Sequence, residues 1–114
     1  MYNKYRVSTK EQRTIYGIVF SSKKEANRYL ILKDREKRNE ISDLQRQVKF
    51  TLQEKFIYAG KKYREINYFA DFSYWDKKLN CTVYEDAKGY RTQTYQIKKK
   101  LLLKKYPDIV FIET

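Results

Sequence analysis

Two carboxylates and one lysine are spaced so that they can act together. Asp71 lies in the apolar segment 68–74, where an ionised side chain needs hydrogen-bond donors or a metal. Asp86 and Lys88 are two residues apart on the next predicted strand, so they share one face of it. A turn at residues 76–80 joins these two strands. We therefore expect Asp71 and Asp86 to meet near one end of a sheet.

Such a pair suits a hard divalent cation. Mg²⁺ takes one or two carboxylates, keeps several waters and accepts its remaining oxygens from substrate phosphate. The carbonyl of Ala87 is a further oxygen that could bind it, and Mn²⁺ is a possible substitute. Lys88 would orient or help to deprotonate an attacking water. The simpler alternatives are a same-face ion pair between Asp86 and Lys88, and an Asp71 that only accepts hydrogen bonds.

The composition excludes other chemistries. The chain has 114 residues, no histidine and one cysteine, Cys81. Serine–histidine–aspartate triads and histidine-ligated metals are therefore excluded, as are disulfides within the chain and cysteine zinc clusters. No apolar run approaches the ~20 residues of a membrane span, and the N-terminus lacks the apolar region of a secretory signal. We expect a cytoplasmic protein that does not contact a membrane.

The charge points to a polyanionic partner. Lys and Arg number 26 against 14 Asp and Glu, which gives a net charge of +12. Residues 65–87 carry −3, whereas residues 88–105 carry +7. An excess of this size favours nucleic acid; the alternative is an ordinary solvated basic surface. A surface that only bound DNA would not need carboxylates where phosphate should lie, and a metal between them resolves that conflict.

The hydrophobic pattern predicts a single α/β domain over residues 1–114. A short hairpin is expected over residues 5–20 and a helix from Ser22 to about residue 38, followed by a connection over 41–50. Strands are expected over 50–58, 63–75 and 81–88, with turns at 59–61 and 76–80. A basic helix over 91–106 then leads to a short buried strand over 108–112. One mixed sheet of four strands with helices packed against it accounts for this order.

Five segments together resemble a known group. They are residues 20–29, 41–44, 68–74, 84–89 and 99–108. In this combination the chain resembles the PD-(D/E)XK nuclease superfamily, and within it a family of small phage-associated proteins. The resemblance implies a restriction-endonuclease-like core in the order α-β-β-β-α-β.

The resemblance also assigns residues. Asp71 matches the metal-binding aspartate of the first motif, although Ala70 replaces the usual proline before it. Asp86 and Lys88 match the acidic residue and the lysine of the second motif. Glu25 matches an acidic residue that many members carry on the first helix. Ser22 and Glu25 also form a capping box, S-x-x-E, so both interpretations of Glu25 remain open; strand parity leaves Glu85 outside the site.

The basic helix is the expected DNA-binding element. Its lysines cannot all face a core, and its polar start follows closely after Lys88. The residues that we expect to contact DNA are Arg91, Gln93, Gln96 and Lys98. An amphipathic helix with a lysine-rich outer face is the alternative.

The function expected from these features is Mg²⁺-dependent hydrolysis of DNA phosphodiester bonds by an endonuclease. The resemblance to small phage enzymes favours branched DNA, including four-way junctions, as the substrate. Two matched cuts in such a junction would need a homodimer. A non-catalytic DNA-binding module, or a protein of a phage replication or packaging complex, is the alternative on the same fold.

Overall fold

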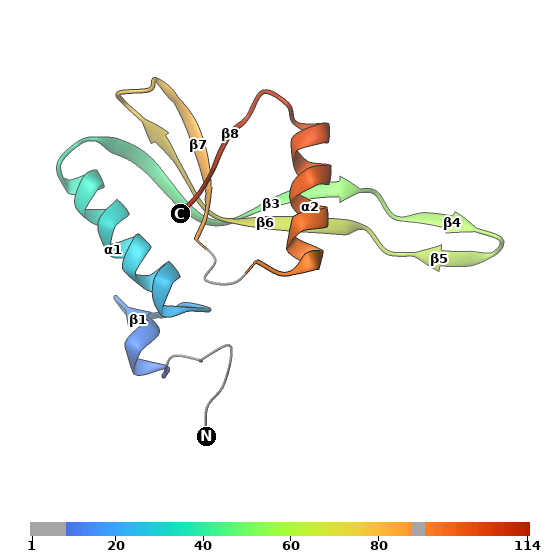
Figure 1. Cartoon of the computed structure of the whole chain (residues 1–114), viewed down its shortest axis with the longest axis horizontal. Helices are drawn as coiled ribbons and strands as arrows, with labels where there is room; N and C mark the ends of the chain where they lie inside the picture. The colour runs from blue at the N-terminus through green and yellow to red at the C-terminus, as the bar shows by residue number, and fades with distance from the viewer. Residues whose placement is uncertain (1–8, 88–90) are drawn as a thin grey trace.

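The computed structural model describes residues 9–87 and 91–114 (Figure 1). It is a single small α/β domain built on one four-stranded mixed sheet and two helices. The sheet strands are β3 (Ile41–Gln53), β6 (Ile66–Asp76), β7 (Cys81–Asp86) and β8 (Val110–Glu113), in the order β3-β6-β7-β8. Strand β6 is antiparallel to both β3 and β7, and β8 lies parallel to β7. The helices are α1 (Lys23–Lys37) and α2 (Gln93–Lys105).

The two helices cover opposite faces of the sheet. Helix α1 packs against a core cluster that includes Val83 and Ile112, whereas α2 packs against one that includes Tyr84 and Phe111. Successive residues of a strand point to opposite faces, so these neighbouring pairs on β7 and β8 assign the clusters to different sides. The result is a sheet between two helical layers. Helices packed against a mixed sheet were predicted, but the expectation of a buried terminal strand was wrong: β8 is an edge strand, so its residues are only half-buried or exposed.

The largest departure from the prediction is residues 41–50. We expected a connection there, and the structure shows the first ten residues of β3, a strand of 13 residues. The predicted strand over 50–58 is instead divided between the end of β3 and β4 (Phe56–Tyr58), which pairs only with β5 (Lys61–Tyr63). The predicted strand over 63–75 begins later, at Ile66, and extends to Asp76.

The two long strands exchange faces at one level. On β6, Ala70 packs in the cluster under α2 but Phe72 packs in the cluster under α1. On β3, Val48 packs under α2, whereas Leu44 packs under α1. Regular alternation would keep each of these pairs on one face. The exchange therefore occurs between Ala70 and Phe72 on β6 and between Leu44 and Val48 on β3. Gln47 lies in this part of β3, and its φ of 52° is left-handed.

The remaining elements are short. The expected hairpin over residues 5–20 is confined to β1 (Thr14–Ile15) and β2 (Ile18–Val19), which follow a 3₁₀ turn at Glu11–Arg13. Ser22 caps α1 by accepting from the backbone N–H of Glu25 at 3.1 Å, as predicted. Among the described residues, no helix is long and apolar enough to cross a membrane.

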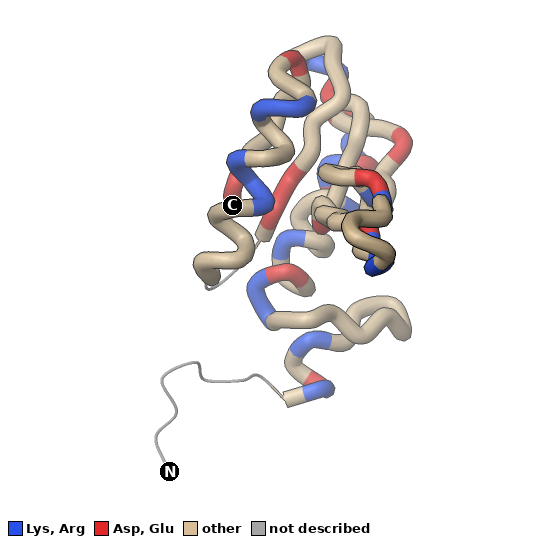
Figure 2. Tube along the Cα trace, turned by 90° about the vertical axis from the view of Figure 1, so that its right-hand side faces the viewer, with Lys and Arg blue, Asp and Glu red and all other residues tan. Residues whose placement is uncertain are grey.

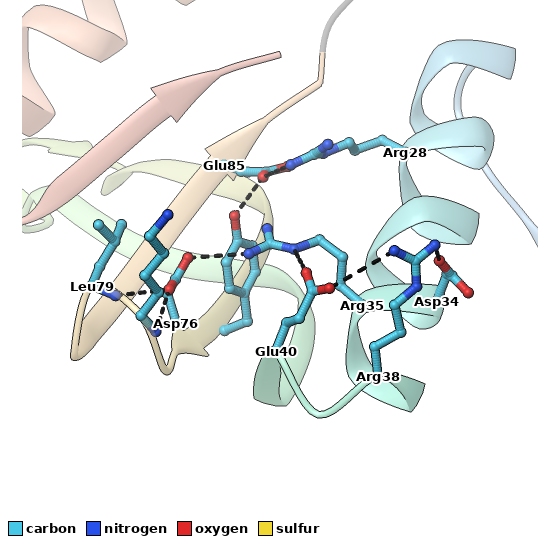
Figure 3. A network of polar contacts seen from close by, with 10 residues as sticks. Arg28, Asp34, Arg35, Arg38, Glu40, Asp76, Leu79 and Glu85 are labelled. Carbon is cyan, nitrogen blue, oxygen red and sulfur yellow. Dashed lines mark hydrogen bonds and ion pairs between the residues drawn. The ribbon is translucent and has the colours of Figure 1, made fainter.

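Asp76 anchors the turn between β6 and β7 to helix α1 (Figure 3). Its Oδ1 accepts from the backbone N–H groups of Lys78 and Leu79, each at 2.9 Å. Its Oδ2 accepts from the Arg35 guanidinium at 3.2 Å. The N–H of Leu79 contributes most to lowering the pKa of Asp76 below its ordinary 3.8, and Arg35 adds to the effect.

We expect Asp76→Asn to lower the free energy of unfolding at neutral pH by about 1–2 kcal/mol, because a charge-assisted network is weakened. A carboxylate whose pKa is lowered by folding stabilises the protein above its unfolded-state pKa. The difference between wild type and variant should therefore shrink as the pH falls below 3.8. Urea denaturation between neutral and acidic pH measures it; a difference that does not change with pH would contradict the assignment.

Candidate active site

Asp71 lies at the level where β6 changes face. The β6–β7 register pairs Phe72 with Glu85, and continuing it by one residue sets Asp71 opposite Asp86. The Asp71 side chain is buried, with 3% of the residue exposed. Its Oδ2 accepts from the backbone N–H of Ala87 at 2.8 Å. The expected meeting of Asp71 with the Asp86 segment is therefore present at the end of the β6–β7 pairing.

Glu25 points into the same region from the first turn of α1. Its carboxylate is almost fully buried and accepts hydrogen bonds from the Ser21 hydroxyl and from the Gln47 amide, the latter at 3.2 Å. The Ser22 cap uses the backbone of Glu25 and leaves this carboxylate to its other partners. Glu25 thus takes part in the helix start through its backbone and faces the sheet through its side chain.

Gln47 connects the two acidic residues. The same amide nitrogen that donates to Glu25 lies 3.5 Å from Asp71 Oδ1. Its left-handed backbone is uncommon for a residue other than glycine, and such conformations are often found at functional sites. The amide bridges α1 and β6 at the face-exchange level, so it holds the Glu25 and Asp71 carboxylates near one another.

Asp86 is completely buried on the α2 side of β7. It accepts a hydrogen bond from the Tyr68 hydroxyl on β6. Burial raises the pKa of Tyr68, and the bond to Asp86 and the negative charges of Asp86 and Asp71 raise it further. The Tyr68 hydroxyl therefore stays protonated and can donate its hydrogen bond to Asp86.

Two predicted site residues have a different status. The N–H of Ala87 contacts Asp71, while its side chain packs in the core under α1; the predicted use of its carbonyl is untested. Lys88 lies outside the described residues, so its predicted role stays a prediction from the sequence.

Glu85 lies on the opposite face of β7 from Asp86, as strand parity predicted. It faces α1, where it forms an ion pair with Arg28 at 2.5 Å and accepts from the Tyr74 hydroxyl at 2.7 Å (Figure 3). The bond to Glu85 is the main cause that raises the pKa of Arg28. Adjacent acidic residues on β7 thus belong to different faces and have different partners.

The described carboxylates do not form a complete metal-binding site by themselves. Within residues 9–87 and 91–114, no group of three or more His, Cys, Asp or Glu side chains is gathered closely enough to hold a metal. Mg²⁺ nevertheless requires only one or two carboxylates when water and phosphate supply the other oxygens. The donors Asp71 and Asp86 are hard oxygens, so they fit such a cation.

The start of α2 borders this site through a cleft. The cleft has a volume of about 500 Å³, and Gln47, Tyr68, Thr94 and Lys98 are among the residues that line it. The Oδ1 atom of Asn67, in the same lining, accepts no hydrogen bond from the described residues. A polar ligand in this cleft would find hydrogen-bonding groups beside the carboxylates.

The four predicted DNA contacts occupy different environments. Lys98 lines the cleft, and Gln93 and Gln96 are exposed. Arg91 instead forms an ion pair with Glu113 of β8 at 2.8 Å. Figure 2 shows basic residues along α2 with acidic residues on the strand beside it. Lys99 and Tyr95 also donate to Glu113 and, with Arg91, lower its pKa to about 2.

Comparison with known proteins identifies the family. The family model described as "Protein of unknown function (DUF1064)" matches residues 2–112. The chain belongs to this family. No curated protein and no solved structure matches it. The DUF1064 match spans the whole site, from Glu25 to the cleft beside α2, but the description of the family names no activity.

Sequence reasoning missed two residues of this DUF1064 site. Gln47 lay in the predicted connection, and nothing in its own neighbourhood indicates a left-handed residue within a strand. Tyr68 belongs to a recognised segment, but its contact with Asp86 follows only from the β6–β7 pairing.

We expect Gln47→Asn to separate stability from activity. Asparagine tolerates the left-handed backbone better than most residues, so the loss of stability should be limited to the lost amide contacts, about 1–2 kcal/mol. Its shorter side chain cannot reach both carboxylates. Under the nuclease activity expected from the sequence, cleavage should therefore fall about 10- to 100-fold, as for other residues that orient metal ligands. Unchanged cleavage would show that the Gln47 amide does not position Glu25 and Asp71.

Proposed function

We propose that this protein is a Mg²⁺-dependent endonuclease that hydrolyses phosphodiester bonds of DNA. The observation that carries the proposal is the position of Asp71, whose buried carboxylate contacts both the Gln47 amide and the backbone that follows β7. Gln47 links Glu25 to Asp71, and Asp71 reaches the backbone immediately after Asp86. The sequence predicted that Asp71 and Asp86 lie close together and bind a divalent cation.

The order of elements supports the finer assignment of the fold. Between Lys23 and Glu113 the order is helix α1, strands β3, β6 and β7, helix α2 and strand β8, with β4 and β5 as a side ribbon. This is the α-β-β-β-α-β order of the PD-(D/E)XK core that the sequence resembles. Asp71 on β6 and Asp86 on β7 occupy the second and third core strands.

The roles follow from the contacts. Asp71 and Asp86 would hold the cation, with Glu25 contributing directly or through water. When bound, the cation supplies Lewis acidity toward the phosphoryl group. The Ala87 N–H keeps Asp71 oriented, and Tyr68 does the same for Asp86.

Other side chains would bind and align the substrate. Lys98 in the cleft is suited to neutralise a phosphate beside the site. Lys88 keeps the role that the resemblance implies, which is to position the attacking water. Mn²⁺ is expected to replace Mg²⁺. The proposed setting is the cytoplasm, which is that of the bacterial host if a phage encodes the protein.

Branched DNA is the proposed substrate class, and a homodimer is the proposed active form. A domain built on one four-stranded sheet and two helices has little surface for reading a long sequence. Recognition of DNA shape through phosphates requires less surface.

The test is cleavage of labelled four-way, flapped and linear duplex DNA by the purified protein with Mg²⁺, Mn²⁺ or EDTA. We expect nicks in Mg²⁺ and Mn²⁺, none in EDTA, and the fastest cleavage on branched substrates. Absence of nicks on every substrate with either metal would overturn the endonuclease assignment, as would cleavage that persists in EDTA. Equal rates on branched and linear DNA would overturn only the substrate class.

A further inference from the structure

Strands β4 and β5 form a two-stranded ribbon that extends beyond the body of the domain (Figure 1). Phe56 pairs with Tyr63, Ile57 with Lys62 and Tyr58 with Lys61, around a turn at Ala59–Gly60. Ala59 and Gly60 both have positive φ, 50° and 77°, which is the geometry of a tight hairpin turn. The ribbon is therefore a regular, defined element that lies away from both helices.

The ribbon exposes large apolar side chains. Ile57 is 68% exposed and Tyr58 is 70% exposed. Phe56 and Tyr63 stack across the strands with ring centroids 4.9 Å apart and planes 6° from parallel. A lone hairpin gains little from its own packing, and apolar surface grouped in this way usually marks an interaction site.

The charge of the ribbon selects the kind of partner. Residues 55–64 contain four basic residues, Lys55, Lys61, Lys62 and Arg64, and no acidic one. Lys55, Lys62 and Arg64 line a groove of about 660 Å³ together with aromatic side chains. Two copies of this ribbon placed together would repel each other, whereas a polyanion would be attracted.

We propose that the β4–β5 ribbon is a second DNA-binding element that grips the substrate away from the cleavage site; this inference rests on the proposed function. A two-stranded ribbon fits the major groove of duplex DNA. Its lysines and arginine bind phosphates, and Tyr58 and Ile57 at the end of the ribbon contact bases. Aromatic side chains stack on unpaired bases, so the ribbon also suits the open centre of a branched substrate.

The test compares Lys61→Gln/Lys62→Gln with a matched pair outside the ribbon, Lys37→Gln/Lys78→Gln, which removes the same charge from exposed positions. Binding to labelled duplex and four-way DNA is measured by fluorescence anisotropy in EDTA over a range of salt. We expect the ribbon variant to bind about tenfold more weakly, with a salt slope reduced by about 2, and the control to bind nearly as wild type. Tyr58→Ala should weaken binding to four-way DNA by a similar factor.

Unchanged affinity and slope in the ribbon variant, at an unaltered melting temperature, would overturn the inference. Equal losses in the ribbon variant and the control would also overturn it, since net charge alone would then explain binding. A concentration-dependent dimer in light scattering that Tyr58→Ala dissociates would assign the ribbon to a second copy instead. Binding in EDTA is measured separately from Mg²⁺-dependent nicking, so the ribbon and the endonuclease proposals fail independently.

Discussion

Asp86→Ala is expected to lower Mg²⁺-dependent cleavage by at least about 10³-fold, in the range found when a group that stabilises developing charge is removed. Asp86 is completely buried and lies beside the Asp71 contact with Ala87. No other described carboxylate on β7 faces α2, because Glu85 points toward α1. The loss is measured under single-turnover conditions with saturating protein.

A matched control is Asp108→Ala, which removes an exposed aspartate from the turn before β8. It should cleave as wild type does. Asp86→Ala should retain the wild-type circular dichroism spectrum and bind DNA in EDTA, because Asp86 belongs to neither apolar core cluster. Cleavage by Asp86→Ala at the wild-type rate would contradict the assignment of Asp86 to the active site.

The second large effect is on stability, on the other face of the same strand. Arg28→Ala should lower the free energy of unfolding by about 3–5 kcal/mol, because it leaves the carboxylate of Glu85 buried without its guanidinium partner. Glu85 is fully buried and retains only the Tyr74 hydroxyl among the contacts described for it. Guanidinium denaturation measures the change.

The double variant Arg28→Met/Glu85→Gln supplies the control. Removing both charges together relieves the uncompensated carboxylate, so much of the lost stability should return. At temperatures where Arg28→Ala remains folded, it should still cleave DNA. A change in unfolding free energy below about 1 kcal/mol, the range typical of exposed ion pairs, would show that this pair behaves like a surface salt bridge.

The sequence predicted the parts of the fold with a regular period. The alternation of β7 predicted that Asp86 and Glu85 lie on opposite faces, and the contacts of Glu85 with Arg28 and Tyr74 confirm its side of the strand. The Ser22 cap at the start of α1 was also predicted from the residue pattern. In each case local chemistry and tertiary packing favour the same structure.

The same reasoning failed for residues 41–50, because two backbone irregularities break the period of two. Asp43 and Gln47 both have left-handed φ angles, 54° and 52°, and the pairing with β6 shifts between Ser42 and Gln45. Apolar residues therefore recur at Ile41, Leu44 and Val48 rather than at alternate positions. A strand whose faces exchange midway does not show the alternation that identifies a strand.

The candidate site depends on that unpredicted irregularity. The spacing of the strands predicted that Asp71 and Asp86 meet, and the resemblance added Glu25, but neither indicated how Glu25 reaches the sheet. The Gln47 amide provides that link across 22 residues of chain. The sequence also predicted that the ribbon is part of one long hairpin. The strands are interrupted between the ribbon and the sheet at residues 54–55 and 64–65, where no glycine or proline marks the break.

Binding of Mn²⁺ without DNA tests most directly whether these carboxylates form a metal site. The free Mn²⁺ signal in electron paramagnetic resonance is followed during titration into wild type, Asp71→Asn, Asp86→Asn and the double variant Arg28→Met/Glu85→Gln. We expect wild type and the double variant to bind Mn²⁺, and both aspartate variants to bind it at least about tenfold more weakly, because each loses an ionised oxygen donor. Mn²⁺ binding by Asp71→Asn and Asp86→Asn that equals wild type would contradict the account.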